Sequence, residues 1–149
     1  MPPGTVKGPM LRRGGEVLES RHTVVSYELD AFGHVNNAVY LNYFEKARND
    51  FLNARGLSFN DFFSWQAFPV LISASLEFIS PARAGDRLLI LGLASSSSRA
   101  RFAIKYEISE EENDRLVCRG ETVHVFIDQN SRPLAVPAEF RRRFLEKPG

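Results

Sequence analysis

Residues 27 to 48 have the sequence YELDAFGHVNNAVYLNYFEKAR, which joins a turn-forming segment to the start of a helix. The turn-forming segment, Leu29 to Asn37, contains Asp, Gly and two consecutive Asn residues, which favour tight turns and helix caps. From Asn37 to about Arg55, apolar side chains recur at helical spacing, and Gly56 follows as a candidate C-terminal cap. At about 1.5 Å per residue, this helix is nearly 30 Å long. Its apolar stripe contains Tyr40, Phe44, Ala47 and Phe51, with Leu41 and Leu52 at the margins.

Segments with strand character lie on both sides of this helix. Glu16 to Glu28 favours a strand before the helix, and Arg101 to Ser109 alternates apolar and polar residues as a half-buried strand does. The other predicted strands are Phe68 to Ser80, Arg87 to Ala94 and Leu116 to Ile127, and short helices are predicted at Asp61 to Trp65 and Pro137 to Leu145. One strand, one long helix and four further strands predict an α+β fold with a five-stranded antiparallel sheet.

Composition narrows the functional classes. The 149 residues fit one domain, with Met1 to Gly15 expected to be a disordered, Gly- and Pro-rich leader and residues 16–146 the folded part. A formal charge of +1 gives no electrostatic reason to expect nucleic acid, and no apolar run has the length of a membrane span. One cysteine, Cys118, excludes an intrachain disulfide and agrees with a cytoplasmic location. The three histidines lack metal-ligand spacing, so we expect no metal and no cofactor.

Asp30 is the main candidate for chemistry. It lies three residues before Gly33, in the turn that leads into the long helix. A helix N-terminus presents free backbone N–H groups that can stabilise an oxyanion, and a nearby carboxylate can act as a base or a nucleophile. Thioester hydrolysis needs little else, since a thiolate is a good leaving group. Spacing alone favours the simpler interpretation, in which Asp30 and Asn36 shape the turn and cap the helix.

The segment Tyr27 to Arg48 resembles the signature of the 4-hydroxybenzoyl-CoA thioesterase branch of the hot-dog superfamily. The shared pattern is Asp-x-x-Gly-x-Val, followed by a Tyr and by Glu-x-Ala-Arg in the helix, and FISPARAGD from Phe78 to Asp86 also resembles a segment of that family. Within the branch, the pattern is most similar to plastid acyl-ACP thioesterases of the methylketone-synthase type and their bacterial relatives. The resemblance implies a hot-dog fold, in which an antiparallel sheet wraps around one long central helix.

The resemblance also implies roles for individual residues. Asp30 takes the place of the catalytic carboxylate, and Asn37 the place whose backbone N–H binds the thioester carbonyl; its side chain cannot act as a general base. The expected substrate-binding residues are Gly33, His34, Val35, Asn36 and Tyr40. The implied substrate is an acyl-CoA or an acyl carrier protein with a fatty or 3-oxo acyl group. The implied assembly is a homodimer or homotetramer with its active sites at the subunit interface.

Alternatives remain at this point. Asp30 attacks the carbonyl directly or activates water, and the sequence does not choose between the two routes. A hot-dog hydratase or dehydratase would need a placed histidine, for which only His34 is available, and a non-catalytic acyl-thioester binding domain would have no use for Asp30. Other residues favour structural roles: a Glu45–Arg48 helix pair, a solvated basic face at Arg141, Arg142 and Arg143, and a packed Cys118. Ser75 and Glu77 share a strand face that either borders the site or is a solvated or interface face.

Overall fold

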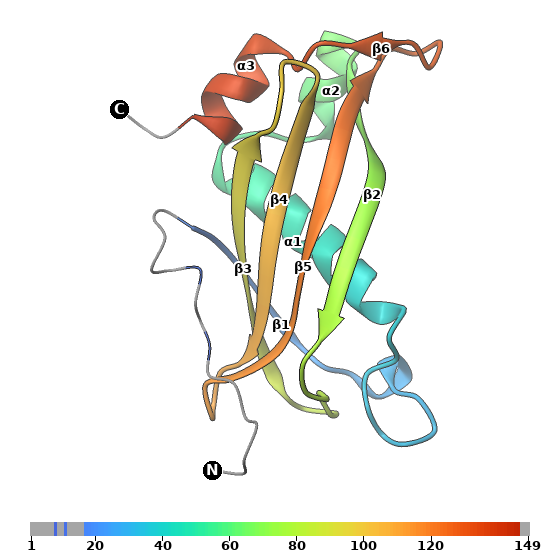
Figure 1. Cartoon of the computed structure of the whole chain (residues 1–149), viewed down its shortest axis with the longest axis vertical. Helices are drawn as coiled ribbons and strands as arrows, with labels where there is room; N and C mark the ends of the chain where they lie inside the picture. Colours follow the sequence, from blue (N-terminus) through green and yellow to red (C-terminus); the bar gives the residue numbers. More distant parts are fainter. Residues whose placement is uncertain (1–7, 9–10, 12–16, 147–149) are drawn as a thin grey trace.

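The computed structural model describes Gly8, Leu11 and residues 17–146, so the predicted leader lies almost entirely outside the described residues. An antiparallel sheet dominates the fold, with strand order β1-β3-β4-β5-β2 and a short β6 paired with β5 (Figure 1). The strands are β1 (Leu18–Thr23), β2 (Phe68–Phe78), β3 (Arg87–Ser96), β4 (Arg101–Glu110), β5 (Arg115–Ile127) and β6 (Pro133–Leu134). The predicted α+β class is confirmed, and the two-residue β6 is the one strand that the sequence analysis did not predict.

The long helix α1 (Val39–Ala54) lies across one face of the sheet, as predicted (Figure 1). The stripe Tyr40, Phe44, Ala47 and Phe51 is buried, and so is Tyr43, whereas Leu41 at the predicted margin is 39% exposed. The Phe44 ring stacks on Tyr106 of β4 with centroids 4.1 Å apart. Two glycines allow this close packing, because a Cβ at Gly92 would overlap the Phe51 ring and one at Gly120 would overlap the Ser75 carbonyl and the Phe44 ring.

Both ends of α1 are defined by local hydrogen bonds. The helix begins at Val39, two residues later than predicted, because Asn36 Oδ1 accepts the Ala38 N–H and the Asn36 carbonyl accepts the Val39 N–H. It ends at Ala54, and Gly56 follows with a φ of 70°, which glycine adopts readily. The Gly56 N–H donates to the Asn53 carbonyl and the Leu57 N–H to the Leu52 carbonyl, which confirms the predicted cap.

The first predicted strand is shorter than expected. It ends at Thr23, and Ser26–Glu28 form a 3-10 turn instead. The reason is the Glu28 side chain, which folds back to accept the Val25 N–H at 2.9 Å and so withdraws this donor from strand pairing. The turn directs the chain away from the sheet and toward the loop that precedes α1.

The remaining elements collect at opposite ends of the sheet. Helices α2 (Phe59–Trp65) and α3 (Ala138–Phe140, continued by a π-helical turn Arg141–Leu145) lie at one end with β6, and the loop before α1 lies at the other (Figure 1). Strand β2 forms one edge of the sheet and contains a bulge between Leu71 and Ser73. Within residues 17–146, no helix is long and apolar enough to cross a membrane.

Candidate active site

The loop Leu29 to Asn37 is a compact, hydrogen-bonded turn. Leu29 and Val35 form an antiparallel bridge, and the Asp30 N–H donates to the His34 carbonyl at 2.7 Å. Asp30 Oδ1 accepts the backbone N–H groups of Phe32 at 2.9 Å and His34 at 3.2 Å. These two bonds orient the carboxylate. Among the described residues no donor is recorded for Oδ2, so one carboxylate oxygen is available to a ligand.

A second loop repeats this geometry elsewhere in the fold. Asp128 Oδ1 accepts the backbone N–H groups of Asn130 at 2.8 Å and Arg132 at 3.0 Å, and the Asp128 N–H donates to the Arg132 carbonyl at 2.9 Å. The turn geometry of Asp30 is thus no evidence of chemistry, because an aspartate in the β5–β6 hairpin has the same geometry. What distinguishes Asp30 is its position beside the N-terminus of α1.

The residue directly before Ala38 and the start of α1, Asn37, leaves its backbone donor free. Asn36 uses both its backbone and its side chain, since its N–H donates to the Glu28 carbonyl and its Oδ1 accepts the Ala38 N–H at 3.0 Å. No acceptor is recorded for the Asn37 N–H within the part of the chain that the structure describes. A free N–H at the start of a 16-residue helix can stabilise a negative charge that develops on a carbonyl oxygen.

Asp30 and Asn37 line one cavity of about 240 Å³ between the loop, α1 and the end of β2. The structure also places three of the five predicted substrate-binding residues in its wall: His34, Val35 and Tyr40. Gly33 and Asn36 lie outside the lining. Gly33 has a φ of 76° and open space around its Cα, so its glycine character serves the turn, and Asn36 serves the helix start. Phe78, Ile79, Ser80 and Pro81 complete the wall; the sequence analysis noted them as part of a family-like segment but did not predict them as site residues.

His34 and Tyr40 line the cavity. A hydrogen bond indicates which ring nitrogen of His34 carries the proton, and burial keeps the hydroxyl of Tyr40 protonated. The Arg83 guanidinium lies 3.2 Å from His34 Nε2. Since arginine can only donate, this nitrogen accepts, and the imidazole proton is then on Nδ1. Burial raises the pKa of Tyr40 to about 12, so its hydroxyl is protonated at neutral pH. Asp30 is therefore the group in this cavity with a free acceptor oxygen for base or nucleophilic chemistry.

Glu28 anchors the loop that carries Asp30, a role that sequence reasoning missed. Glu28 Oε1 accepts the Tyr43 hydroxyl at 3.0 Å and the Val25 N–H at 2.9 Å, and lies 2.9 Å from His22 Nε2. Burial alone would raise the pKa of Glu28, but the bonds from His22, Val25 and Tyr43 outweigh it and lower the pKa. Because the Glu28 carbonyl also holds the Asn36 N–H, the side chain ties the loop to β1 and α1.

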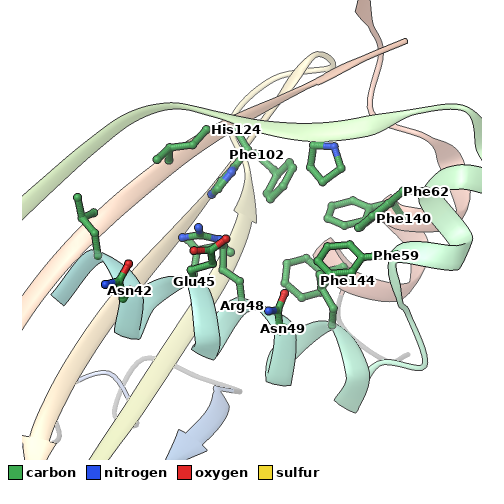
Figure 2. A pocket seen from close by; sticks show the side chains of 15 residues that line it. Asn42, Glu45, Arg48, Asn49, Phe59, Phe62, Phe102, His124, Phe140 and Phe144 are labelled. Atoms are coloured by element: carbon green, nitrogen blue, oxygen red, sulfur yellow. The ribbon is translucent and has the colours of Figure 1, made fainter. Parts of the chain in front are cut away.

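A second cavity of about 360 Å³ lies between α1, α2, α3 and the sheet, beside β2 (Figure 2). Polar side chains from α1 line one wall, and the other end is aromatic, with Phe59, Phe62, Phe102, Phe140 and Phe144. The predicted Glu45–Arg48 pair is wrong: Arg48 Nη1 instead donates to the Tyr106 hydroxyl at 3.2 Å. Glu45 and Arg48 both border the cavity, but their side chains form no ion pair despite their spacing on the helix.

The remaining candidates have structural surroundings. Glu77 is exposed on the outer sheet face and pairs with Arg119 at 3.2 Å, and Arg142 pairs with Glu139 at 2.7 Å. Cys118 is fully buried in β5, and burial raises the pKa of its thiol to about 12. Among the described residues, no three His, Cys, Asp or Glu side chains are grouped so that they could hold a metal ion.

Comparison with known proteins places this architecture in a family. Residues 24–144 match the model of the Thioesterase-like superfamily. The chain is 30% identical over 137 residues to a chloroplastic acyl-acyl carrier protein thioesterase of Arabidopsis thaliana, covering 89% of this chain and 72% of that protein. It is 36% identical over 107 residues to a 1,4-dihydroxy-2-naphthoyl-CoA hydrolase of Synechocystis, covering 66% of this chain and 78% of that protein.

The fold agrees with this assignment. The crystal structure of a 1,4-dihydroxy-2-naphthoyl-CoA thioesterase from Synechocystis superposes with a TM-score of 0.80 at 27% identity, covering 87% of this chain and 96% of that one. The region matched by the family model includes the Asp30 loop, all of α1 and strands β2 to β5, and it begins directly after β1 ends. The chain therefore belongs to the Thioesterase-like superfamily, has its hot-dog fold, and is an acyl thioester hydrolase.

Proposed function

We propose that hydrolysis takes place in the cavity at the start of α1, with Asp30 as the base or nucleophile and the Asn37 N–H as the oxyanion donor. The observation that carries this proposal is that a carboxylate with one free oxygen and a free helix N-terminal donor line the same cavity. Attack by Asp30 Oδ2 on the thioester carbonyl would give an anhydride and release the thiolate. Alternatively, Oδ2 removes a proton from a water that attacks the carbonyl.

The substrate-binding residues in this proposal remain Gly33, His34, Val35, Asn36 and Tyr40. Gly33 and Asn36 act through backbone geometry, since they hold the turn and the helix start in place. His34, Val35 and Tyr40 contact the thioester end of the substrate directly from the cavity wall. Tyr40 is 3% exposed, which fits a hydroxyl at the inner wall.

A homodimer or homotetramer formed through β2 is part of the same proposal. Strand β2 is an eleven-residue edge strand, and Leu71, Ile72 and Phe78 on it are 46%, 45% and 50% exposed. Long edges with exposed apolar residues favour pairing with another chain. Under a two-fold axis the paired β2 strands are antiparallel, so the end that carries Phe78 in one protomer lies toward the end that begins at Phe68 in the other.

This pairing joins the two cavities. The Asp30 cavity includes Phe78 at one end of β2, and the 360 Å³ cavity includes Pro69 and Leu71 at the other end. In the proposed dimer the thioester is held at Asp30 of one protomer, and the acyl group extends into the larger cavity of the second protomer. An Ile72→Lys variant, with a charge on the edge, should be monomeric by light scattering and lose hydrolysis. An active Ile72→Lys monomer would contradict the interface site.

The acyl donor in this proposal is an acyl-CoA or an acyl carrier protein, and the enzyme works in the cytoplasm without nucleic acid or membrane partners. Release of free thiol from matched acyl-CoA and acyl-carrier substrates tests it, and the buried Cys118 gives a low background with thiol reagents. We expect turnover with at least one donor. The absence of thiol release with both donors would favour an acyl-thioester binding domain.

A further inference from the structure

Arg48 is a half-buried cation that uses little of its hydrogen-bonding capacity. A guanidinium carries five N–H donors, and the recorded bond is the one from Nη1 to the Tyr106 hydroxyl at 3.2 Å. Within residues 17–146 no carboxylate lies within ion-pair distance of Arg48, and this includes Glu45, which is exposed at the border of the same cavity. A charge removed from water without partners is costly, so the remaining N–H groups of Arg48 favour an acceptor in the cavity.

The bond to Tyr106 continues as a buried chain of polar groups. The Tyr106 hydroxyl lies 2.7 Å from Thr122 Oγ1, which lies 2.8 Å from His124 Nε2. Because arginine only donates, the Tyr106 oxygen accepts from Arg48. Among the described residues the other partner recorded for the Tyr106 hydroxyl is Thr122 Oγ1, so the Tyr106 O–H donates to it. The Thr122 hydroxyl then donates to His124 Nε2, and one consistent direction runs along the whole chain.

This direction determines what His124 offers to the cavity. Burial, together with the nearby charge of Arg48, lowers the pKa of His124 to about 4, so the ring is neutral at physiological pH. With Nε2 accepting from Thr122, the ring proton is on Nδ1. No acceptor for Nδ1 is recorded in the described part of the chain. His124 is therefore a second hydrogen-bond donor.

Arg48 and His124, at the two ends of this hydrogen-bond chain, reach the same cavity from opposite sides. Figure 2 shows Arg48 extending from α1 and His124 from β5 into one space, next to the aromatic end formed by Phe102 and its neighbours. Two fixed donors beside an apolar pocket are suited to a ligand that is mostly apolar and carries an acceptor oxygen at one position. A purely hydrocarbon ligand would leave both donors without a partner, which is unfavourable.

We propose that Arg48 and His124 select acyl groups that carry an acceptor oxygen, a carbonyl or a carboxylate, in addition to the thioester. This inference rests on the proposed function, because it assigns the larger cavity to the acyl group. The cavity of about 360 Å³ has room for such a ligand. It holds roughly 12 groups of the size of a water molecule, at about 30 Å³ each, and a methylene group is similar in size.

Three CoA thioesters of equal chain length test the proposal: octanoyl-CoA, 3-oxooctanoyl-CoA and 7-carboxyheptanoyl-CoA, the monothioester of octanedioic acid. The wild type should hydrolyse one of the two oxygenated substrates with a kcat/KM at least 10-fold above that of octanoyl-CoA, and the choice between them identifies a neutral or an anionic acceptor. In Arg48→Met this ratio should fall by about 10- to 100-fold, the range expected for a hydrogen bond to a charged group. Arg87→Met, which removes an exposed arginine at the start of β3, is the matched control and should keep the wild-type ratio.

A second readout does not depend on turnover. Titration calorimetry compares the binding of octanoate and octanedioate. The wild type should bind the dicarboxylate more tightly, and Arg48→Met should remove the difference. If the kinetic panel selects the 3-oxo group, 3-oxooctanoate takes the place of octanedioate. An equal ratio in wild type and Arg48→Met, by kinetics or by titration, would overturn the proposal. If the wild type hydrolyses none of the three CoA thioesters, the same acyl groups are offered on an acyl carrier protein. The absence of turnover with both donors means that the proposed function fails, and the titration still decides the role of Arg48.

Discussion

Replacing Glu28 by alanine should loosen the loop that carries Asp30 without touching the cavity itself. The substitution removes the acceptor of three groups at once: the Val25 N–H, the Tyr43 hydroxyl and His22 Nε2. Each lost bond costs about 1 kcal/mol, so the free energy of unfolding should fall by about 3 kcal/mol. For a chain of this size, that lowers Tm by about 6 to 12 °C.

The same substitution should lower kcat by about 10- to 100-fold at a temperature where the variant is folded, since a displacement near 1 Å is enough for such a loss. The assay is thiol release under saturating substrate, with circular dichroism to establish folding. Glu28→Gln keeps an acceptor for Val25 and Tyr43 and should retain more activity. Glu77→Ala, which breaks an exposed pair with Arg119, is a control with little expected effect. A folded Glu28→Ala variant with wild-type kcat would refute the anchoring role.

Two further predictions concern stability. The pKa of His124 is lowered from 6.5 to about 4, so as pH falls through this window the unfolded chain takes up a proton that the folded chain does not. The free energy of unfolding, measured with urea, should therefore fall by about 3 kcal/mol over this window, and by less in His124→Asn. If both proteins show the same pH dependence, another group is responsible. Gly92→Ala should cost about 1 to 3 kcal/mol, because the new methyl group overlaps the Phe51 ring, and an unchanged Tm would contradict this packing.

The sequence predicts the parts of this fold that depend on local pattern. The apolar stripe of α1 and the cap at Gly56 are set by neighbours a few residues away, and the structure confirms them. Strand β4 forms as predicted and buries Phe102, Ile104, Tyr106 and Ile108, but Ala103 and Glu107 on its other face are buried too, so it is not the half-buried strand that its alternation predicts. The helix start was placed two residues early, since both Asn36 and Asn37 are good caps and only the bond from Ala38 to Asn36 Oδ1 distinguishes them.

The sequence does not predict contacts that the sheet register creates. Glu28 meets His22 and Tyr43 only because β1 and α1 pack together, and no motif connects them. Arg48 was expected to pair with Glu45 at helical spacing, but its partner Tyr106 lies 58 residues away in the chain. The resemblance at Asp30 predicts one candidate site, whereas the second cavity is visible only in three dimensions.

In the proposed function Asp30 carries the chemistry and is more than a turn residue, and a second aspartate of this protein is the control that separates these roles. Asp128 holds a turn of the same geometry but does not line the cavity, and asparagine can replace either side chain as an acceptor at Oδ1. The measurement is kcat/KM for one acyl-CoA with wild type, Asp30→Asn and Asp128→Asn. We predict a loss of at least about 100-fold in Asp30→Asn and none in Asp128→Asn. Equal activity of the two folded variants would contradict the account.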